Sequence, residues 1–191
     1  MLGPELGARV EEQKIADLDV GIDRDRFFRR MIRELSGVLQ EVVGEDEARG
    51  FVSVVGARIG DLFNQTYQEK LGGRALVRPE VADALVDLKA RIGGEFSVES
   101  QSDDEITFVN TRCPFAESVE GRPSLCMMTS NVFGRIAAQN LGYARVTVKE
   151  ALATGHSRCL VHVSLKHDDD ADGEPGSREY YRAVSPVSDQ G

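Results

Sequence analysis

Three cysteines are the residues of this chain whose type and spacing could do chemistry. Cys113 lies in the sequence Thr-Arg-Cys-Pro-Phe, Cys126 in Leu-Cys-Met-Met, and Cys159 four positions after a glycine. Twelve residues separate the first two and thirty-two separate the second from the third, so the chain has no Cys-x-x-Cys pair of the zinc-finger type. Thiolates bind soft metals and iron–sulfur clusters, which makes the three cysteines a candidate ligand set.

Each cysteine falls at the end of an expected structural element. Cys113 lies where a strand must end before a proline, and Cys159 begins a strand. Cys126 lies in the first turn of an expected helix, where free amides and the helix dipole favour a thiolate. These three element ends could converge on one iron–sulfur cluster or on one zinc ion. A fourth ligand could be His156, Glu150, a solvent molecule or a small thiol.

Burial is the competing interpretation of the same residues. Cysteine is among the most buried residue types, and Cys159 alternates with Val161 and Val163 on one face of its expected strand. His156 follows a glycine in an expected turn, where a solvated histidine is equally at home. The cysteines are therefore either ligands or core thiols, and both interpretations stay open.

Apolar residues recur at helical spacing in three segments, about 23–43, 46–69 and 79–92. Asp23 is expected to cap the first helix. The spacing of Gly56 and Gly60 predicts close packing of the second helix against a neighbour. The buried face of the third helix is expected at Val81, Ala84, Leu85, Leu88 and Ile92.

The pattern then changes to the period of two that is typical of strands. It predicts a hairpin over 95–101 and 105–112 and two strands over 144–149 and 159–165. Between the two strand pairs, apolar residues at helical spacing predict a helix over 124–141. The predicted fold class is α+β. N-terminal helices pack on a small, mostly antiparallel four-stranded sheet, with one helix between the two strand pairs.

The length of 191 residues fits one domain with short extensions. Residues 1–22 are predicted to be an N-terminal lead-in and 23–167 a single α+β sensory domain. Residues 168–191 begin with consecutive aspartates and continue with Gly, Pro and Ser, which predicts a mostly disordered acidic tail. Within it, Tyr180-Tyr181 could dock locally.

Composition excludes several classes of protein. The chain has 23 Lys and Arg residues against 32 Asp and Glu residues, and the net charge of −9 argues against direct nucleic-acid binding. No apolar run approaches the roughly 18 residues of a membrane span, and residues 1–12 lack the apolar segment of a secretory signal. A cytoplasmic location is expected, where cysteines stay reduced.

Four segments carry a resemblance to the methanogen output domain family: 110–115 (Asn-Thr-Arg-Cys-Pro-Phe), 125–134 (Leu-Cys-Met-Met-Thr-Ser-Asn-Val-Phe-Gly), 142–144 (Gly-Tyr-Ala) and 155–159. Members of that family are sensory or output domains of prokaryotic signalling proteins, related in outline to the 4-vinyl-reductase (Bet3-like) ligand-binding domains. The resemblance implies an α+β sensor fold and a homodimer through the N-terminal helices. It implies no particular ligand.

Two further families share parts of the pattern. Suf-type iron–sulfur repressors are similar in their Cys-Pro-Phe and Leu-Cys sequences, with the same spacing, and their thiolates hold a cluster. They usually add a cysteine after the third one and a winged helix ahead, and this chain has neither. The L-2-amino-thiazoline-4-carboxylic acid hydrolase family is similar in its cysteine order, but it usually has an aspartate where residues 127–129 are Met-Met-Thr.

The sequence therefore favours a cytoplasmic sensor or regulatory domain. Cys113, Cys126 and Cys159 would bind an iron–sulfur cluster or another thiophilic metal, with His156 as a further metal ligand. The domain would signal through its homodimer or through a signalling protein partner. The first alternative is a metal-free module that binds a small apolar ligand, lined by Phe108, Phe115, Met128 and Phe133. The second alternative is a hydrolase, with a cysteine nucleophile and His156 as base.

Overall fold

The computed structural model describes residue 15 and residues 18–168 and 176–183; most of the predicted lead-in and much of the predicted tail lie outside the described residues. The helices are α1 (Arg24–Val43), α2 (Glu45–Lys70), α3 (Arg78–Arg91) and α4 (Cys126–Leu141), and the strands are β1 (Phe96–Gln101), β2 (Glu105–Asn110), β3 (Tyr143–Glu150), β4 (Cys159–Ser164) and β5 (Ser177–Tyr181). Three short 3₁₀ turns are η2 (Ala116–Val119), η3 (Pro123–Leu125) and η4 (Leu152–Thr154).

The strands form one sheet in the order β1-β2-β4-β3-β5, and every neighbouring pair is antiparallel. The predicted α+β class is confirmed, and α4 connects the β1–β2 hairpin to β3 as expected. The described sheet has five strands, so the prediction of four was wrong in this detail.

The additional strand, β5, comes from the segment for which the sequence favoured disorder. Tyr180 of β5 is buried, and its ring packs on Gly134 of α4. A Cβ atom at Gly134 would lie 2.0 Å from the Tyr180 ring, so only glycine allows this approach. The sequence indicated local docking of Tyr180-Tyr181, but an acidic run rich in Gly and Pro hid the strand.

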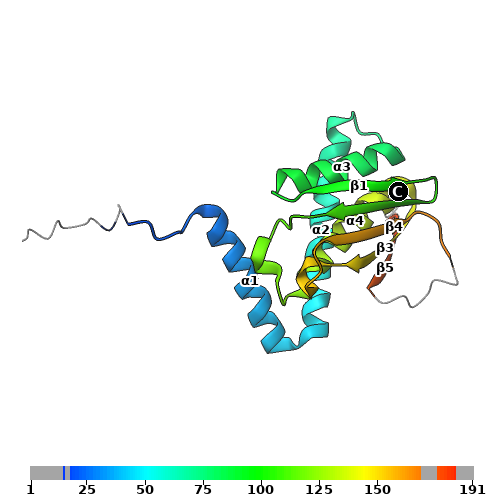
Figure 1. Cartoon of the computed structure of the whole chain (residues 1–191). Helices are drawn as coiled ribbons and strands as arrows, with labels where there is room; N and C mark the ends of the chain where they lie inside the picture. The colour runs from blue at the N-terminus through cyan, green and yellow to red at the C-terminus, as the bar shows by residue number, and fades with distance from the viewer. Residues whose placement is uncertain (1–14, 16–17, 169–175, 184–191) are drawn as a thin grey trace, which may run out of the picture.

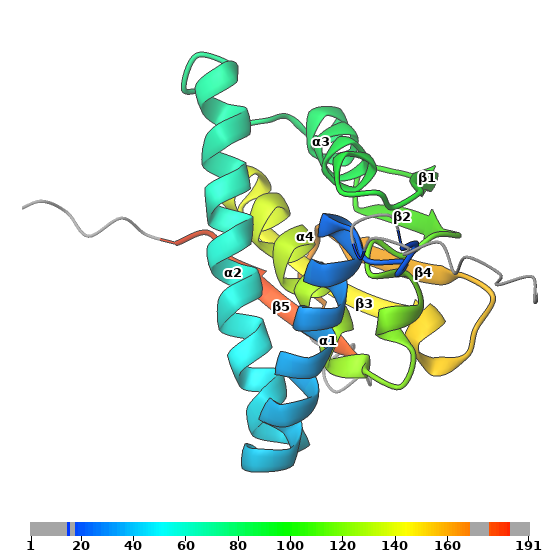
Figure 2. The same ribbon diagram turned by 90° about the vertical axis from the view of Figure 1, so that its left-hand side faces the viewer.

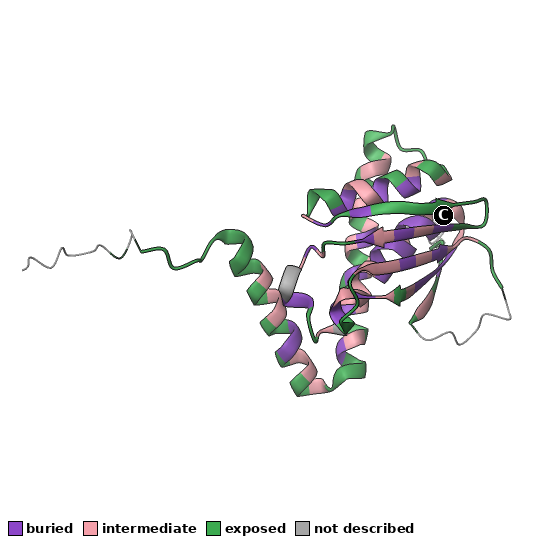
Figure 3. Cartoon of the chain, in the orientation of Figure 1, coloured by how far each residue is buried: buried purple, intermediate pink, exposed green. Residues whose placement is uncertain are grey.

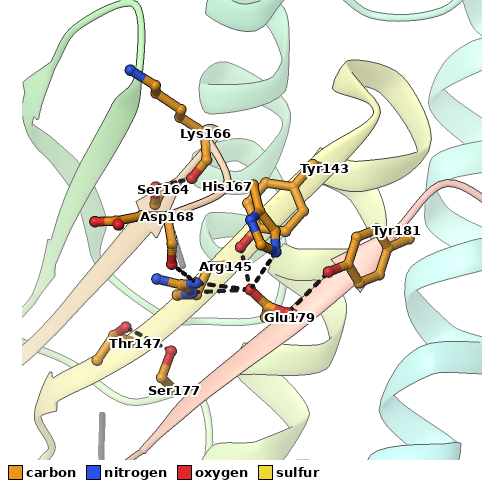
Figure 4. Close-up of polar contacts among 10 residues, drawn as sticks. All are labelled: Tyr143, Arg145, Thr147, Ser164, Lys166, His167, Asp168, Ser177, Glu179 and Tyr181. Atoms are coloured by element: carbon orange, nitrogen blue, oxygen red, sulfur yellow. Dashed lines mark hydrogen bonds and ion pairs between the residues drawn. The ribbon is translucent and has the colours of Figure 1, made fainter. Parts of the chain in front are cut away.

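A polar network on the open face of the sheet holds β5 against β3 (Figure 4). The Glu179 carboxylate accepts hydrogen bonds from Tyr143 Oη at 2.6 Å, Arg145 Nη2 at 2.8 Å and Tyr181 Oη at 3.0 Å. The hydrogen bonds from Tyr143 and Arg145 lower the pKa of Glu179 to about 2. Arg145 is buried and also donates to the Asp168 carbonyl at 2.7 Å. This network gives the short strand a specific register.

The core lies between the sheet and α4, and α2 covers the other side of α4 (Figure 2). Two glycines allow α2 to approach α4 closely. A Cβ atom at Gly56 would lie 2.8 Å from Asn131 Cβ, and one at Gly60 would lie 2.9 Å from Arg135 Cβ. The predicted close packing at these glycines is therefore confirmed. With the sheet on one side and α2 packed closely on the other, α4 is buried on almost all sides.

Helix α1 begins at the predicted cap, where Asp23 Oδ1 accepts a hydrogen bond from Arg26 N at 2.8 Å. It packs on α2 and on the segment 115–125, and the hairpin of α1 and α2 extends away from the sheet (Figure 1). Few of its residues are buried (Figure 3). Leu35 and Val42 are 63% and 75% exposed. The apolar face that the sequence predicted for α1 is thus largely open.

Candidate functional site

The three cysteines line one small cavity, which we call the inner cavity. Cys113, Cys126 and Cys159 reach it from three elements that are distant in the sequence, and each side chain is half-buried. The volume of the inner cavity is about 30 Å³. Apart from the thiols, Asn110 and Thr129 are the polar side chains of its lining, and the remaining walls are apolar.

The position of Cys113 is fixed by the residues on either side of it. Asn110 is buried at the end of β2, and its Oδ1 accepts hydrogen bonds from Glu95 N at 3.1 Å and Arg112 N at 3.2 Å. Pro114 packs against Gly94, where a Cβ atom would lie 2.9 Å from Pro114 Cγ. The chain therefore leaves the sheet with a defined path, and Cys113 lines the inner cavity.

Cys159 is paired with the end of β2 in the sheet. It lies opposite Asn110 in the register of β2 and β4, which brings it close in space to the segment that carries Cys113. Its Sγ accepts a hydrogen bond from Leu152 N at 3.4 Å. The antiparallel pairing of β2 and β4 thus accounts for the convergence of two of the three thiols.

Cys126 is the first residue of α4, as expected. Burial, together with the neighbouring Cys159 and Cys113, raises the pKa of the Cys126 thiol to about 12. The expectation that the helix start favours a thiolate here is wrong, because burial removes the hydration that a thiolate needs. Without a ligand, Cys126 is a neutral thiol at pH 7.

A buried lysine lies directly behind the wall of the inner cavity. Lys89 is 4% exposed, and its Nζ donates a hydrogen bond to Thr129 Oγ1 at 2.8 Å. The same Nζ lies 5.2 Å from the ring centroid of Phe96 and 5.4 Å from that of Phe133, which are cation–π distances. Phe96 and Thr129 also line the inner cavity, so the ammonium is one side chain away from it.

In the described part of the chain, no carboxylate forms an ion pair with Lys89. Burial lowers the pKa of Lys89 to about 8, and the groups whose charges would raise it are Cys113, Cys159 and Cys126. At pH 7 the side chain is therefore mostly an ammonium. Its described contacts are with a hydroxyl group and two aromatic rings, and all three are neutral.

Sequence reasoning missed Lys89 and placed Ile92 on this buried face instead. That expectation was wrong, since Ile92 is 47% exposed. The missed signal was the spacing of Val81, Leu85 and Lys89, which are four residues apart and share one helical face. Both Val81 and Leu85 are fully buried.

A second, open cavity of about 600 Å³ lies beside the inner cavity, and we call it the outer cavity. Cys113 lines both cavities. His156 lines the outer cavity, together with Arg112 and Glu120, and is exposed; its Nδ1 lies 3.1 Å from Thr154 Oγ1. The structure thus brings the three cysteines to one cavity and places His156 at the neighbouring one.

Within residues 18–168 and 176–183, no three His, Cys, Asp or Glu side chains form a group that could hold a metal ion as they stand. The three thiols would therefore have to approach one another to share an ion. Their chemistry still selects the kind of ion. Three thiols in apolar walls, with no carboxylate in the lining, match soft metals such as zinc rather than calcium or magnesium.

The aromatic residues expected to line an apolar site fall in different places. Phe108 and Phe133 are fully buried core residues in edge-to-face contact. Phe115 lines the inner cavity. Phe115 and Met128 also line an apolar groove of about 330 Å³ between α1, α2 and α4.

The segment 115–125 lies beside α1 (Figure 2). On its cavity side, Val119 and Leu125 line the inner cavity. On its other side, Arg33 Nη1 of α1 donates hydrogen bonds to the carbonyls of residues 118 and 120, both at 2.8 Å. Gln40 Nε2 donates to Ser124 Oγ at 2.8 Å. The segment 115–125 thus contacts the inner cavity on one side and α1 on the other.

One solved structure is similar to this chain in its fold. This is a trafficking protein particle complex subunit 3 from Naegleria fowleri, covalently bound to palmitic acid. The TM-score is 0.53 at 15% sequence identity, over 74% of this chain and 97% of that chain. At this identity the likeness shows the fold alone, and it agrees with the expected Bet3-like relation.

The family model described as methanogen output domain 1 matches residues 31–164, and the chain belongs to that family. The predicted resemblance is confirmed, and membership supports a regulatory or sensory role. No curated protein matches the chain. In the described ranges, no helix is both long enough and apolar enough to cross a membrane.

Proposed function

We propose that this chain is a regulatory domain that receives its signal at the inner cavity, as a soft metal ion bound by Cys113, Cys126 and Cys159. One observation carries the proposal. Three thiols that are distant in the sequence line the same cavity: one lies in the loop after β2, one at the start of α4 and one at the start of β4. The thiols would close on an ion by movement of the segment 115–125, which lies between Cys113 and Cys126.

The size of the inner cavity favours one ion over a cluster. Its volume of about 30 Å³ is more than the roughly 10–15 Å³ that a single water molecule needs, so it has room for one small ligand. A zinc ion fits such a space, whereas an iron–sulfur cluster of several atoms needs the walls to separate. Zinc is therefore preferred to the cluster as the ligand. Solvent entering past Cys113 from the outer cavity would complete a four-coordinate site.

Ligation would pass to α1 through the segment 115–125. Cys113 lies just before this segment and Cys126 just after it, so drawing the two thiols together displaces the segment between them. Arg33 and Gln40 connect the segment to α1 by hydrogen bonds. Replacing Arg33 by alanine would weaken this coupling and, because coupling between sites is reciprocal, would also change the metal affinity.

The exposed apolar face of α1 and α2 is the proposed output surface, and we propose a second copy of this chain as its partner. Leu35, Val38 and Phe51 are each more than half exposed on it. The first half of α1 carries exposed arginines at positions 24, 26 and 30, whereas its end and the start of α2 carry exposed acids at 41, 45, 46 and 47. A two-fold axis that sets two α1 helices antiparallel pairs these opposite charges.

The metal proposal is tested on untagged protein purified without oxygen. Iron, sulfide and zinc are measured in the sample, and the metal-free protein is then titrated with Cd²⁺ while the thiolate-to-metal absorption is recorded. Each of Cys113→Ala, Cys126→Ala and Cys159→Ala is expected to remove most of the bound metal and of the absorption. His162→Ala, a change at a histidine of the open sheet face, serves as the control. Full occupancy in all three cysteine variants would refute the shared site.

The partner proposal is tested by the mass of the protein in solution over a range of concentrations. Leu35→Asp places a charge on the proposed interface and is expected to yield monomers. Glu34→Gln, on the adjacent position, is the matched control and should keep the dimer. A monomeric wild-type protein, with or without metal, would contradict the second-copy proposal.

A metal-free module for an apolar ligand is the second candidate, because the inner cavity has mostly apolar walls and Phe115 joins it to the apolar groove. The solved structure of similar fold carries covalently bound palmitic acid. Intact mass spectrometry and organic extraction of the purified protein test this candidate. A co-purified apolar molecule without metal would favour it over the metal site.

A further inference from the structure

We infer that the inner cavity is a binding site for a carboxylate group, which Asn110 and Thr129 hold by hydrogen bonds and which Lys89 balances in charge. The inference rests on the second candidate function, the metal-free module for a small ligand, and it names the class of that ligand. No metal ion takes part. The carboxylate belongs either to a small free acid such as formate or to the head group of a longer acid.

The first argument is a buried amide group that still has hydrogen bonds to donate. Asn110 is 1% exposed and lines the inner cavity. Its Oδ1 accepts hydrogen bonds from Glu95 N and Arg112 N, which fixes the orientation of the amide and turns Nδ2 away from these groups. No described residue accepts a hydrogen bond from Nδ2, and yet Nδ2 is not among the described unpaired atoms that are completely sealed in the protein. Nδ2 therefore borders open space, and the space that Asn110 lines is the inner cavity.

The second donor is the hydroxyl group of Thr129. Its Oγ1 accepts a hydrogen bond from Lys89 Nζ at 2.8 Å, and no described group accepts the hydroxyl proton. Thr129 also lines the inner cavity. The side-chain oxygens of the lining, Asn110 Oδ1 and Thr129 Oγ1, thus already receive hydrogen bonds, whereas their donors remain available. Such a lining fits a ligand that brings acceptor atoms.

The charge of the site selects an anion among such ligands. Lys89 is 4% exposed, and its described contacts are with Thr129 and with the rings of Phe96 and Phe133, all of them neutral. The lining of the inner cavity contains no Asp, Glu, Lys, Arg or His. A buried ammonium without a counter-ion destabilises a folded protein, and one negative charge in the cavity would compensate it.

The pairing of β1 and β2 brings these groups to the same end of the cavity. Phe96 lies directly opposite Asn110 in the register of the two strands, and residues in such a pair have neighbouring side chains. Lys89 Nζ lies 5.2 Å from the centroid of the Phe96 ring, and both Phe96 and Thr129 line the cavity. The ammonium and the two donors therefore lie around one ring.

The size of the inner cavity favours a carboxylate over larger anions. A single water molecule needs roughly 10–15 Å³, so a volume of about 30 Å³ has room for two or three non-hydrogen atoms. A carboxylate group has this size and carries one negative charge, whereas phosphate and sulfate are larger and carry more charge. The inner and outer cavities share Cys113, Val119, Leu152 and Ala153 in their linings, so the chain of a longer acid would extend into the outer cavity.

The experiment titrates the full-length protein, freed of metal by a chelator, with formate and with its neutral amide, formamide. The pH is 7 and the ionic strength is constant. The side-chain amide signals of Asn110 in nitrogen–proton NMR spectra report binding at the inner cavity. Formate is expected to bind at least about tenfold more tightly than formamide, which has nearly the same shape, because a hydrogen bond to a charged group is the stronger one.

Three variants assign the preference to the residues that cause it. Lys89→Met removes the ammonium and should remove the preference for formate over formamide. Lys70→Met, a change at an exposed lysine at the end of α2, is the matched control and should keep the preference. Asn110→Asp keeps the oxygen that holds the two backbone amides but replaces the donor by an oxygen, so it should abolish formate binding, followed here by the backbone signal of Thr129. Near-ultraviolet circular dichroism establishes that each variant is folded.

Acetate and butyrate distinguish the two sources of the carboxylate. Binding that weakens as the chain lengthens would identify a small free acid. Binding that becomes tighter would identify the head group of a longer acid, with its chain in the outer cavity. In both cases each acid should bind more tightly than the amide of the same length.

The outcomes separate this inference from the proposed functions. If formate and formamide bind equally, or if Lys89→Met keeps the preference for formate, the carboxylate site is refuted, and the second candidate function stands with a neutral ligand. If no acid of the series changes the Asn110 signals, the carboxylate site is refuted as well. The extraction experiment then decides the second candidate function, and the Cd²⁺ titration decides the metal site.

Discussion

Replacing Lys89 by methionine should stabilise the metal-free protein, although it removes a hydrogen bond. The pKa of Lys89 falls from 10.5 to about 8 on folding, chiefly because the side chain is buried. Each pKa unit corresponds to about 1.4 kcal/mol, so carrying the charge costs the folded state roughly 3 kcal/mol. This cost is fully present at pH 7, which lies below both pKa values.

Two favourable interactions of Lys89 offset part of this cost. The hydrogen bond to Thr129 contributes about 1 kcal/mol, and the contacts with Phe96 and Phe133 contribute a few tenths to about 1 kcal/mol together. Methionine has nearly the same length and no charge to bury. The free energy of unfolding should therefore increase by about 1 to 2 kcal/mol in Lys89→Met.

Urea unfolding at pH 7, in the presence of a chelator, measures this difference. The midpoint should rise while the slope stays the same, which indicates an unchanged buried surface. Lys70→Met, which removes an exposed charge, should change the free energy of unfolding by less than about 0.5 kcal/mol. A Lys89→Met protein that is less stable than the wild type by 1 kcal/mol or more would refute the reasoning, because the ammonium would then support the fold.

Three further predictions concern β5 and its contacts. Gly134→Ala should lower the free energy of unfolding by about 3 kcal/mol, because the added methyl group meets the Tyr180 ring, and urea unfolding checks this. Tyr180→Phe should change it by less than about 1 kcal/mol, and towards greater stability, because the buried Tyr180 hydroxyl has no hydrogen-bond partner among the described residues; a large loss in the same assay would reveal such a partner. Glu179→Gln should make stability less dependent on pH in acid. Folding lowers the pKa of Glu179 from 4.5 to about 2, so the ionised carboxylate stabilises the wild type fully above about pH 4.5, and this stabilisation is lost as the pH falls towards 2. Thermal midpoints measured between pH 4.5 and 2 should therefore fall more steeply in the wild type than in the variant.

The regular elements could be predicted because their patterns are local. The spacing of apolar residues predicted four helices, and the alternation of apolar residues predicted four of the five strands. Asp23 and the pair Gly56 and Gly60 had the expected roles, since capping and close helix packing depend on residue type at a fixed position. β5 was missed because its stability depends on Arg145 and Gly134, which are distant in the sequence.

Part of the candidate site was also predictable from local sequence patterns. The ends of elements indicated that Cys113, Cys126 and Cys159 could meet, and the structure places them on one cavity. The protonation of Cys126 could not be predicted, because it depends on how deeply packing buries the helix start. Lys89 was missed because a lysine within an apolar stripe is normally assigned to the surface.

The most direct test of the metal site counts the thiols that one equivalent of Zn²⁺ protects from a thiol-reactive dye in the full-length protein. The account predicts that one equivalent of Zn²⁺ slows the reaction of Cys113, Cys126 and Cys159 together, relative to the folded metal-free protein under the same conditions. Protection of none of them, or of Cys113 alone, would contradict a metal site shared by the three cysteines.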